Sequence, residues 1–186
     1  MYQYIRMMGT TLIPAIAAVI LISPSPAVAE SAAGLEADAD AALNQLYQGS
    51  PEAKMLSGKA TAILVFPNIV KAGFIVGAQY GEGVLRKNGR TVGFYSSVAG
   101  SYGLQAGVQG FGYALFLMTD SAVQYLDNSD GWEIGVGPSI VVVDTGAGRA
   151  LTSTTLKDDV YAFIFDQRGL MAGMGIQGSK ISRISK

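Results

Sequence analysis

The sequence predicts a single α+β domain, built on a mainly antiparallel, strongly curved, glycine-rich sheet with two helices before it and one helix inserted between its strands. Residues 73–118 alternate with a period of two, and their glycines gather on one face. Residues 31–58 show a helical period instead. The 186 residues are 49% hydrophobic and 15% charged, with 24 glycines, which favours a compact β-rich fold over disorder.

Residues 1–29 have the pattern of a secretory signal peptide, so we expect one folded domain over residues 30–186. Arg6 precedes an apolar run over 7–22, and Ala27-Val28-Ala29 forms a small-x-small cleavage site before Glu30. An uncleaved anchor is the alternative, but the apolar run is shorter than the ~20 residues of a spanning helix. We expect an exported, periplasmic protein, free or peripheral to a membrane. The sequence has no cysteine, so it predicts neither disulfides nor a lipoprotein.

The first folded elements are two predicted helices. The first helix begins after Ser31 and ends at Gly49, and its early turns contain the acidic residues Glu36, Asp38 and Asp40. Its apolar stripe is formed by Leu35, Ala39, Leu43 and Leu46. Ser50 caps the second helix, which starts with Pro51 and runs to Gly58. Residues 61–66 then predict a buried strand that Pro67 stops.

Three successive strands are predicted over residues 73–118. The first, 73–83, places Phe74, Val76, Ala78 and Tyr80 on one face and mostly glycine on the other. Asn88-Gly89 supplies the two positive-φ residues of a tight type I′ turn, so 92–98 is the returning strand of a hairpin. The third run continues the alternation over 101–109 and becomes densely apolar to 118.

Glycine in these strands predicts close approach of a neighbouring layer. Each strand glycine costs roughly 0.5 to 1 kcal/mol relative to alanine, so many of them need a compensating contact. Close packing of a helix or second sheet is one explanation, and a ligand groove along the bare face is the alternative. The structural glycines that we single out are Gly73, Gly77, Gly81, Gly103, Gly107, Gly135 and Gly137.

Beyond residue 118 the pattern alternates between helix and strand. A helix is expected over 119–126, followed by the polar turn 127–131, which lacks the ligand spacing of a calcium loop. Residues 132–144 predict a long strand with a bulge or edge at Pro138, buried on both faces over 140–143. Further strands are expected over 160–165 and 170–176.

The residue types argue against an enzyme. The sequence contains no histidine, which excludes a Ser/His/acid triad, and no cysteine, which excludes thiol chemistry and Cys/His zinc sites. No glycine-rich phosphate motif opens a helix. Adjacent Asp158-Asp159 is typical of a solvated turn or cap. We therefore predict no catalytic residue, no metal site and no cofactor, and the net charge of -1 gives no reason to expect nucleic-acid binding.

Two basic clusters are the candidate lipid contacts. At about 1 kcal/mol per cation near an anionic membrane, a cluster of three supplies ~3 kcal/mol, less than the ~4.1 kcal/mol of millimolar affinity. Apolar insertion, a head-group pocket or multivalent display would have to add to it. The alternative is that both clusters are solubilising surface. They comprise Arg86, Lys87 and Arg90 at the predicted hairpin turn, and Lys180, Arg183 and Lys186 at the C-terminus.

Several motifs in order resemble the SYLF domain, a family of lipid-binding modules of bacteria and of eukaryotic adaptor proteins that join actin to endocytic membranes. The resemblance covers about residues 50–184. Its motifs are Gly58-Lys59-Ala60, Ile63-Leu64-Val65-Phe66-Pro67, Lys71-Ala72-Gly73-Phe74, Tyr80-Gly81-Glu82-Gly83-Val84-Leu85, Ala99-Gly100-Ser101-Tyr102-Gly103-Leu104-Gln105-Ala106-Gly107, Gly131-Trp132-Glu133-Ile134-Gly135-Val136-Gly137-Pro138, Tyr161-Ala162-Phe163 and Gly169-Leu170-Met171-Ala172-Gly173.

The resemblance implies a compact α+β fold and phospholipid binding, with phosphoinositides favoured among eukaryotic members. The chain departs from those members because its first helix carries Glu36, Asp38 and Asp40 instead of a basic face, and it contains no SH3 or FYVE module. An exported protein would not meet actin in its normal compartment.

Two functions follow as hypotheses. The first is a non-enzymatic periplasmic module that binds anionic phospholipid, a lipid-like ligand or a membrane surface. The second is a structural or envelope-stress domain that binds an envelope protein partner and no small ligand. A small outer-membrane barrel would suit the alternating strands but not the helices before and within the sheet region.

Overall fold

The structure is a computed structural model that describes residues 30–73, 76–102, 107–129, 131–143, 157–169, 176 and 178–186. The predicted signal peptide, Gly103 and nearly all of the strand expected over 170–176 lie outside these residues. Every statement below concerns the described part of the chain.

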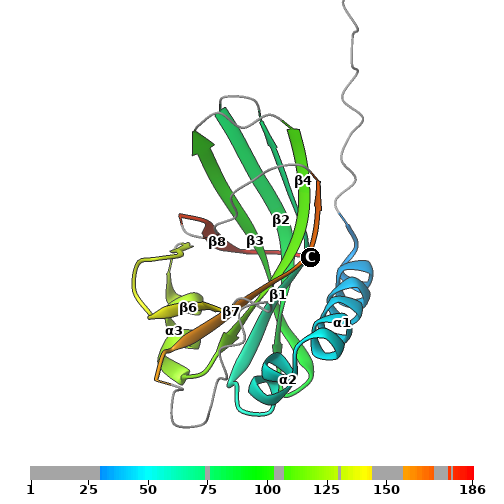
Figure 1. Ribbon diagram of the computed structural model, residues 1–186. Coiled ribbons are helices and arrows are strands. Elements are labelled where there is room, and N and C mark those ends of the chain that lie inside the picture. Colours follow the sequence, from blue (N-terminus) through cyan, green and yellow to red (C-terminus); the bar gives the residue numbers. More distant parts are fainter. Residues whose placement is uncertain are drawn as a thin grey trace, which may run out of the picture.

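The fold is α+β, as predicted, with one strongly curled sheet of eight strands in the order β5-β8-β3-β2-β1-β4-β7-β6 (Figure 1). Neighbouring strands are antiparallel except β6 and β7, which are parallel. The four long central strands are β1 (Ala62–Gly73), β2 (Val76–Lys87), β3 (Arg90–Tyr102) and β4 (Gly107–Leu117). The others are β5 (Trp132–Glu133), β6 (Ile140–Val143), β7 (Val160–Gly169) and β8 (Lys180–Ile184).

The three predicted helices are confirmed, and so is the cap predicted at Ser50. The helix α1 (Ala32–Gly49) begins at Ser31, whose hydroxyl accepts a hydrogen bond from the amide of Gly34. The helix α2 (Pro51–Ser57) is capped by Ser50, and α3 (Asp120–Asn128) by Thr119. The first turn of α1 contains no acidic residue, because Glu36 already lies in the second turn, so the dipole stabilisation expected there is weaker than predicted.

Each face of the sheet has its own hydrophobic core. On the helix face, α1 and α2 cover Ile63, Val65, Val84 and Phe116. On the opposite, inner face, α3 and Trp132 pack against side chains that include Phe66, Leu85 and Tyr113. Figure 1 shows α1 and α2 on one side of the curled sheet and α3 on the other. The sheet is therefore the central layer, and alternate residues of each strand belong to different cores.

Pro67 does not end the first strand, contrary to the prediction. The strand β1 continues to Gly73, and its pairing with β2 shifts register between Val65 and Asn68. A bulge accommodates a proline because the extra residue leaves the hydrogen-bond ladder. The segment predicted as one strand over 73–83 is consequently split, with Gly73 at the end of β1 and Val76 at the start of β2.

The strand predicted over 132–144 is also wrong as a continuous element. It is broken into β5 and β6, because Gly135 and Gly137 adopt φ angles of 106° and 92° that turn the chain. The strand β6 is not buried on both faces, since it lies at the sheet edge beside β7 and Val142 is exposed. The strand β8, which pairs with β3, was not predicted.

Close approach explains some of the predicted structural glycines and backbone conformation explains others. A Cβ at Gly81 would meet the side chain of Ile69, and one at Gly83, which was not singled out, would lie 2.6 Å from Cδ1 of Phe66. Both glycines therefore leave room for side chains of the adjacent strand β1, and not for a helix or a second sheet as predicted. Gly107 and Gly135 have open space around them but φ angles of 138° and 106°. At these two positions glycine is required by the backbone and not by packing.

Candidate functional site

The predicted cations of the hairpin turn have different environments. Arg86 is largely buried and holds the hairpin to α1. Its Nη2 donates hydrogen bonds to Oδ1 of Asp40 at 2.6 Å and to the carbonyl oxygen of Glu36 at 3.1 Å. Lys87 and Arg90 are exposed on either side of the turn. Asn88 and Gly89 have φ angles of 52° and 74°, which confirms the predicted tight turn.

The three predicted C-terminal cations also lie in different environments. Lys180 is exposed on β8, opposite Val98 of β3. Arg183 lies toward α3, where its Nη1 is 3.6 Å from Oδ1 of Asp127. The Cζ of its guanidinium lies 5.9 Å from the ring centroid of Tyr95. The side chain of Lys186 is only 6% exposed and forms an ion pair with Glu82. The six predicted basic residues therefore do not gather into one basic patch.

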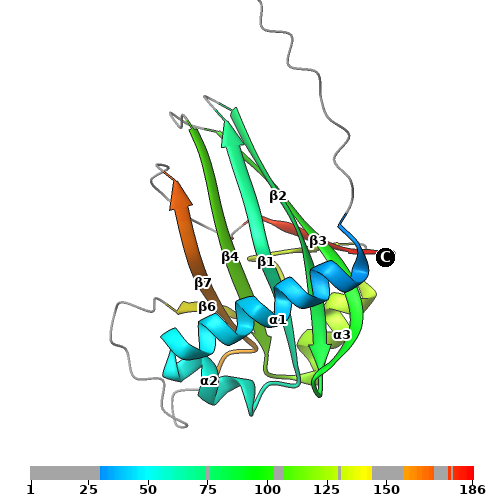
Figure 2. The same ribbon diagram turned by 90° about the vertical axis from the view of Figure 1, so that its right-hand side faces the viewer.

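A different surface stands out, which we call the uncovered face. The long strands β1 to β4 extend well beyond α1, as Figure 2 shows, and their outer halves are left without a helix on the helix face. Five large apolar side chains there are 46% to 68% exposed, and Ala72 and Ala78 are exposed between them. Val76, Ala78 and Tyr80 are each an even number of positions from Val84, which α1 covers. They therefore lie on the same side of the sheet as Val84. The large residues are Val70, Val76, Tyr80, Val98 and Val108.

The register of the sheet aligns a row of residues across this face. Val70 lies opposite both Gly110 and Tyr80, and Tyr80 lies opposite Val98. The same row continues to Arg168 of β7 beyond Gly110 and to Lys180 of β8 beyond Val98. Both end residues are exposed cations. The uncovered face is thus an apolar surface with one positive side chain at each lateral rim.

Each rim cation has an acidic neighbour. Arg168 forms an ion pair with Asp166, and Lys180 lies opposite Glu133 of β5. Exposed pairs of this kind contribute little energy and are screened by salt. The apolar side chains must therefore provide most of any affinity that this face has.

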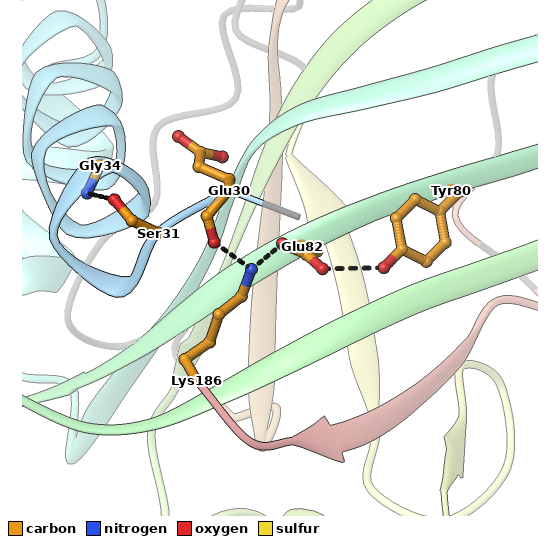
Figure 3. Close-up of polar contacts among 6 residues, drawn as sticks. All are labelled: Glu30, Ser31, Gly34, Tyr80, Glu82 and Lys186. Carbon is orange, nitrogen blue, oxygen red and sulfur yellow. Dashed lines mark hydrogen bonds and ion pairs between the residues drawn. The ribbon is translucent and has the colours of Figure 1, made fainter. Parts of the chain in front are cut away.

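A cluster at the base of the uncovered face joins both ends of the domain (Figure 3). The ammonium of Lys186 donates to the carbonyl oxygen of Glu30 at 2.6 Å and pairs with Glu82, and the hydroxyl of Tyr80 donates to Oε1 of Glu82 at 2.9 Å. Burial acts to raise the pKa of Glu82, but the hydrogen bonds from Lys186 and Tyr80 together outweigh it and hold that pKa below its usual value. Burial raises the pKa of Glu30, and the nearby charge of Asp38 raises it further.

A polar cavity of about 330 Å³ lies between α1 and the sheet at the β7 rim of the uncovered face. Gly110 and Arg168 belong both to this cavity and to the row described above. Its other polar lining residues are Asp38, Gln45, Asn68 and Asp166.

Sequence reasoning missed the residues that define the uncovered face. The alternation of Val76, Ala78 and Tyr80 was recognised, but the pattern does not say which face a helix covers. Val108 was recognised in the same way, but Val70 and Val98 were not singled out, and neither was Arg168. A usable signal was the length of the strands, since strands of 11 to 13 residues extend beyond the width of α1, which crosses them, and beyond the short α2.

The described residues contain no cluster of three or more acidic, histidine or cysteine side chains able to hold a metal. In the same part of the chain, no helix combines the length and apolarity that crossing a bilayer requires.

These features define a curled-sheet α+β domain with an exposed apolar binding surface. Residues 98–186 match the family described as Ysc84, Las17-binding protein actin regulator, which contains the SYLF domain. This match over residues 98–186 confirms, for that part of the chain, the resemblance to the SYLF family seen in the sequence. The matched part contains Val98, Val108 and both rim cations. No curated protein matches the chain.

Proposed function

We propose that this protein is a non-enzymatic module that binds the surface of anionic phospholipid membranes with its uncovered face. The observation that carries the proposal is the row from Arg168 to Lys180, in which apolar side chains on three adjacent strands, and Gly110 on a fourth, lie between two cations. Apolar groups suit the acyl boundary of a bilayer and the rim cations suit lipid phosphates. The match of residues 98–186 to the SYLF family, which relates to lipid and actin binding, supports the same function.

The contacts available on the uncovered face can provide a free energy of the order that weak membrane association requires. Burying the exposed half of a valine or tyrosine side chain contributes about 1 kcal/mol, so five such residues provide at most ~5 kcal/mol. The two rim cations add about 1 kcal/mol each. The sum exceeds the ~4.1 kcal/mol that corresponds to millimolar affinity. The proposal therefore predicts weak, reversible association that depends more on apolar contact than on charge.

Export is part of the proposal. The signal-like pattern of residues 1–29 supports it, and the periplasmic leaflet of a bacterial membrane would then be the surface that the domain meets. N-terminal sequencing of the periplasmic fraction should find a chain that begins at Glu30. A chain that keeps residues 1–29 in the cytoplasm would contradict this location.

Co-sedimentation with vesicles tests the binding surface. Wild-type protein should pellet with vesicles of phosphatidylcholine and phosphatidylglycerol, and more weakly with phosphatidylcholine alone. The double variant Val70→Ser/Val98→Ser should lower the partition coefficient roughly tenfold to thirtyfold, because two apolar contacts are lost.

Val142→Ser is the matched control, since Val142 and Val98 are both 47% exposed but Val142 lies on the edge strand β6. Lys180→Gln should weaken pelleting only with anionic vesicles, and Lys87→Gln serves as its control. Equal pelleting of wild type and the double variant would exclude the uncovered face as the membrane contact. Saturable capture of one envelope protein, with no vesicle binding, would favour the interaction-domain alternative.

A further inference from the structure

The inner face of the sheet carries a second unusual row, on the reverse of the uncovered face. Lys71 of β1 lies opposite Gln79 of β2 on one side and opposite Gln109 of β4 on the other. The three residues are 7%, 4% and 4% exposed. Three adjacent strands therefore place a cation and two amides together in the interior, where apolar residues would pack at less cost.

The ammonium of Lys71 has no counter-charge within the described residues. The four ion pairs in this part of the chain involve Arg86, Arg168, Arg183 and Lys186, and no hydrogen bond joins Lys71 to any described residue. Most of the Lys71 side chain is buried, but its Nζ is not fully enclosed, so the unpaired ammonium can be reached by an anion from solvent. The position indicates a place for an anion.

The two glutamines define what else the anion must carry. Nε2 of Gln79 donates a hydrogen bond of 2.9 Å to Oγ of Ser179, which fixes that amide. Oε1 of Gln109 is buried and has no hydrogen-bond partner. An unsatisfied buried acceptor requires a donor, so a ligand that suits both residues presents an anionic oxygen to Lys71 and an O–H group to Gln109.

The next row of the same face consists of glycine and is open on the β4 side: a Cβ at Gly73 would lie 2.4 Å from Cα of Gly77, whereas Gly107 has no such neighbour. Gly73 lies opposite both Gly77 and Gly107, so three neighbouring strands contribute no side chain there. A Cβ at Gly107 would have no atom within 4 Å. Bare backbone next to a buried cation is the arrangement that lets a ligand approach a sheet closely.

We propose that Lys71, Gln79 and Gln109 form an interior site for a phosphate group that carries a hydroxyl donor. The ammonium of Lys71 binds the anionic oxygens, and Oε1 of Gln109 accepts a hydrogen bond from the P–OH group or from a polyol hydroxyl attached to the phosphate. Gln79 holds the second side of the site. The proposal is independent of the uncovered face, which lies on the opposite side of the same strands.

Thermal unfolding in matched salts tests the anion chemistry. Phosphate near neutral pH retains a proton that it can donate, whereas sulfate is a tetrahedral anion without one. Millimolar phosphate should raise the melting temperature of the full chain by roughly 3–6 °C over sodium chloride of equal ionic strength. Sulfate should raise it less. Equal effects of phosphate and sulfate would overturn the role given to Gln109.

Lys71→Met tests the site directly, with Lys87→Met as the control for an exposed lysine on the adjacent strand. Lys71→Met should abolish the phosphate response and, without phosphate, melt no lower than wild type, because a buried charge has been removed. Lys87→Met should keep the response. A wild type that phosphate does not stabilise beyond chloride, or a Lys71→Met variant that responds as wild type does, would overturn the proposal.

Two further measurements keep the test informative if Lys71→Met does not fold. Lys71→Arg keeps the charge and should retain phosphate binding, measured by equilibrium dialysis on the folded protein. Inorganic phosphate, glycerol 3-phosphate and dihexanoyl phosphatidylglycerol distinguish the source of the group. Binding of the short-chain lipid alone assigns a lipid head group, and binding of all three assigns the phosphate itself. Binding of none by the wild type would exclude the site.

Discussion

Lys186 forms an ion pair with Glu82 across 104 positions of sequence, and their side chains are only 6% and 15% exposed. The pair fastens the chain after β8 to the middle of β2. The second hydrogen bond of Lys186, to the carbonyl oxygen of Glu30, brings the start of the folded domain to the same point. One ammonium group therefore holds both ends of the domain at the base of the uncovered face.

Removal of that ammonium should destabilise the fold. Lys186→Met leaves the carboxylate of Glu82 partly buried without its cation, so the free energy of unfolding should fall by about 1–3 kcal/mol in urea titrations. The double variant Lys186→Met/Glu82→Gln should recover most of the loss. Arg183→Gln is the control, since the pair of Arg183 with Asp127 is about half exposed and should contribute less than ~1 kcal/mol. A single variant as stable as wild type would show that the pair contributes nothing.

The lowered pKa of Glu82 predicts a stability difference that depends on pH. A carboxyl whose folded pKa lies below its unfolded value stabilises the fold above the unfolded value of about 4.3, and this contribution is lost as pH falls through the folded pKa. Glu82→Gln should therefore be less stable than wild type at pH 7, and the two should converge below about pH 4. Chemical unfolding at several pH values measures the difference.

The charge of Glu30 should have the opposite effect on stability to that of Glu82. Its pKa is raised by burial and by Asp38, so its charge opposes folding at neutral pH. Glu30→Gln should cost no stability at pH 7, in contrast to Glu82→Gln. A loss at pH 7 as large as that of Glu82→Gln would contradict the assignment of the two carboxyl groups.

The strand glycines give a prediction that separates packing from backbone freedom. Gly83→Ala should lower the free energy of unfolding by about 1–3 kcal/mol, because its Cβ would overlap the ring of Phe66 and the carbonyl oxygen of Val65. Gly100→Ala is the matched control, since a Cβ there meets no atom within 4 Å and the backbone is not in the left-handed region. Its stability should be unchanged or raised by up to about 1 kcal/mol. Equal losses in both variants would mean that strand propensity, and not close approach, selects glycine.

Local signals allowed much of this fold to be predicted. The hairpin at Asn88-Gly89 and the three capped helices depend on residues a few positions apart, and all were found in the structure. The prediction that Pro67 ends the first strand was wrong because the effect of a proline depends on the strands around it. Inside β1, between β2 and β4, a bulge accommodates a residue that would otherwise end a strand.

The candidate surfaces depended on long-range pairing and were largely beyond sequence reasoning. Arg168, Val70 and Lys180 share a row only because β7, β1 and β8 come together in one sheet. In the sequence, Lys71 was noted only as part of a family motif. Its burial became apparent only in the structure, where the strand register places Gln79 and Gln109 beside it. Basic residues adjacent in sequence, such as Arg86 and Lys87, proved to have different surroundings.

The hairpin cations offer a last test that separates structural from binding roles. Arg86→Gln removes the ion pair with Asp40 and the bond to the carbonyl oxygen of Glu36, so α1 should be held less firmly and the free energy of unfolding should fall by about 1–3 kcal/mol. Lys87→Gln and Arg90→Gln remove exposed charges and should change stability by less than ~0.5 kcal/mol.

If the turn also contacts lipid, the two exposed variants should weaken pelleting with anionic vesicles while leaving the unfolding curve unchanged. If only the uncovered face contacts lipid, they should pellet as wild type does, and Lys180→Gln alone should be impaired. Unfolding and sedimentation measured on the same preparations distinguish the two arrangements, because Arg86 acts through the fold. Lys87, Arg90 and Lys180 are exposed and form no ion pair within the described residues.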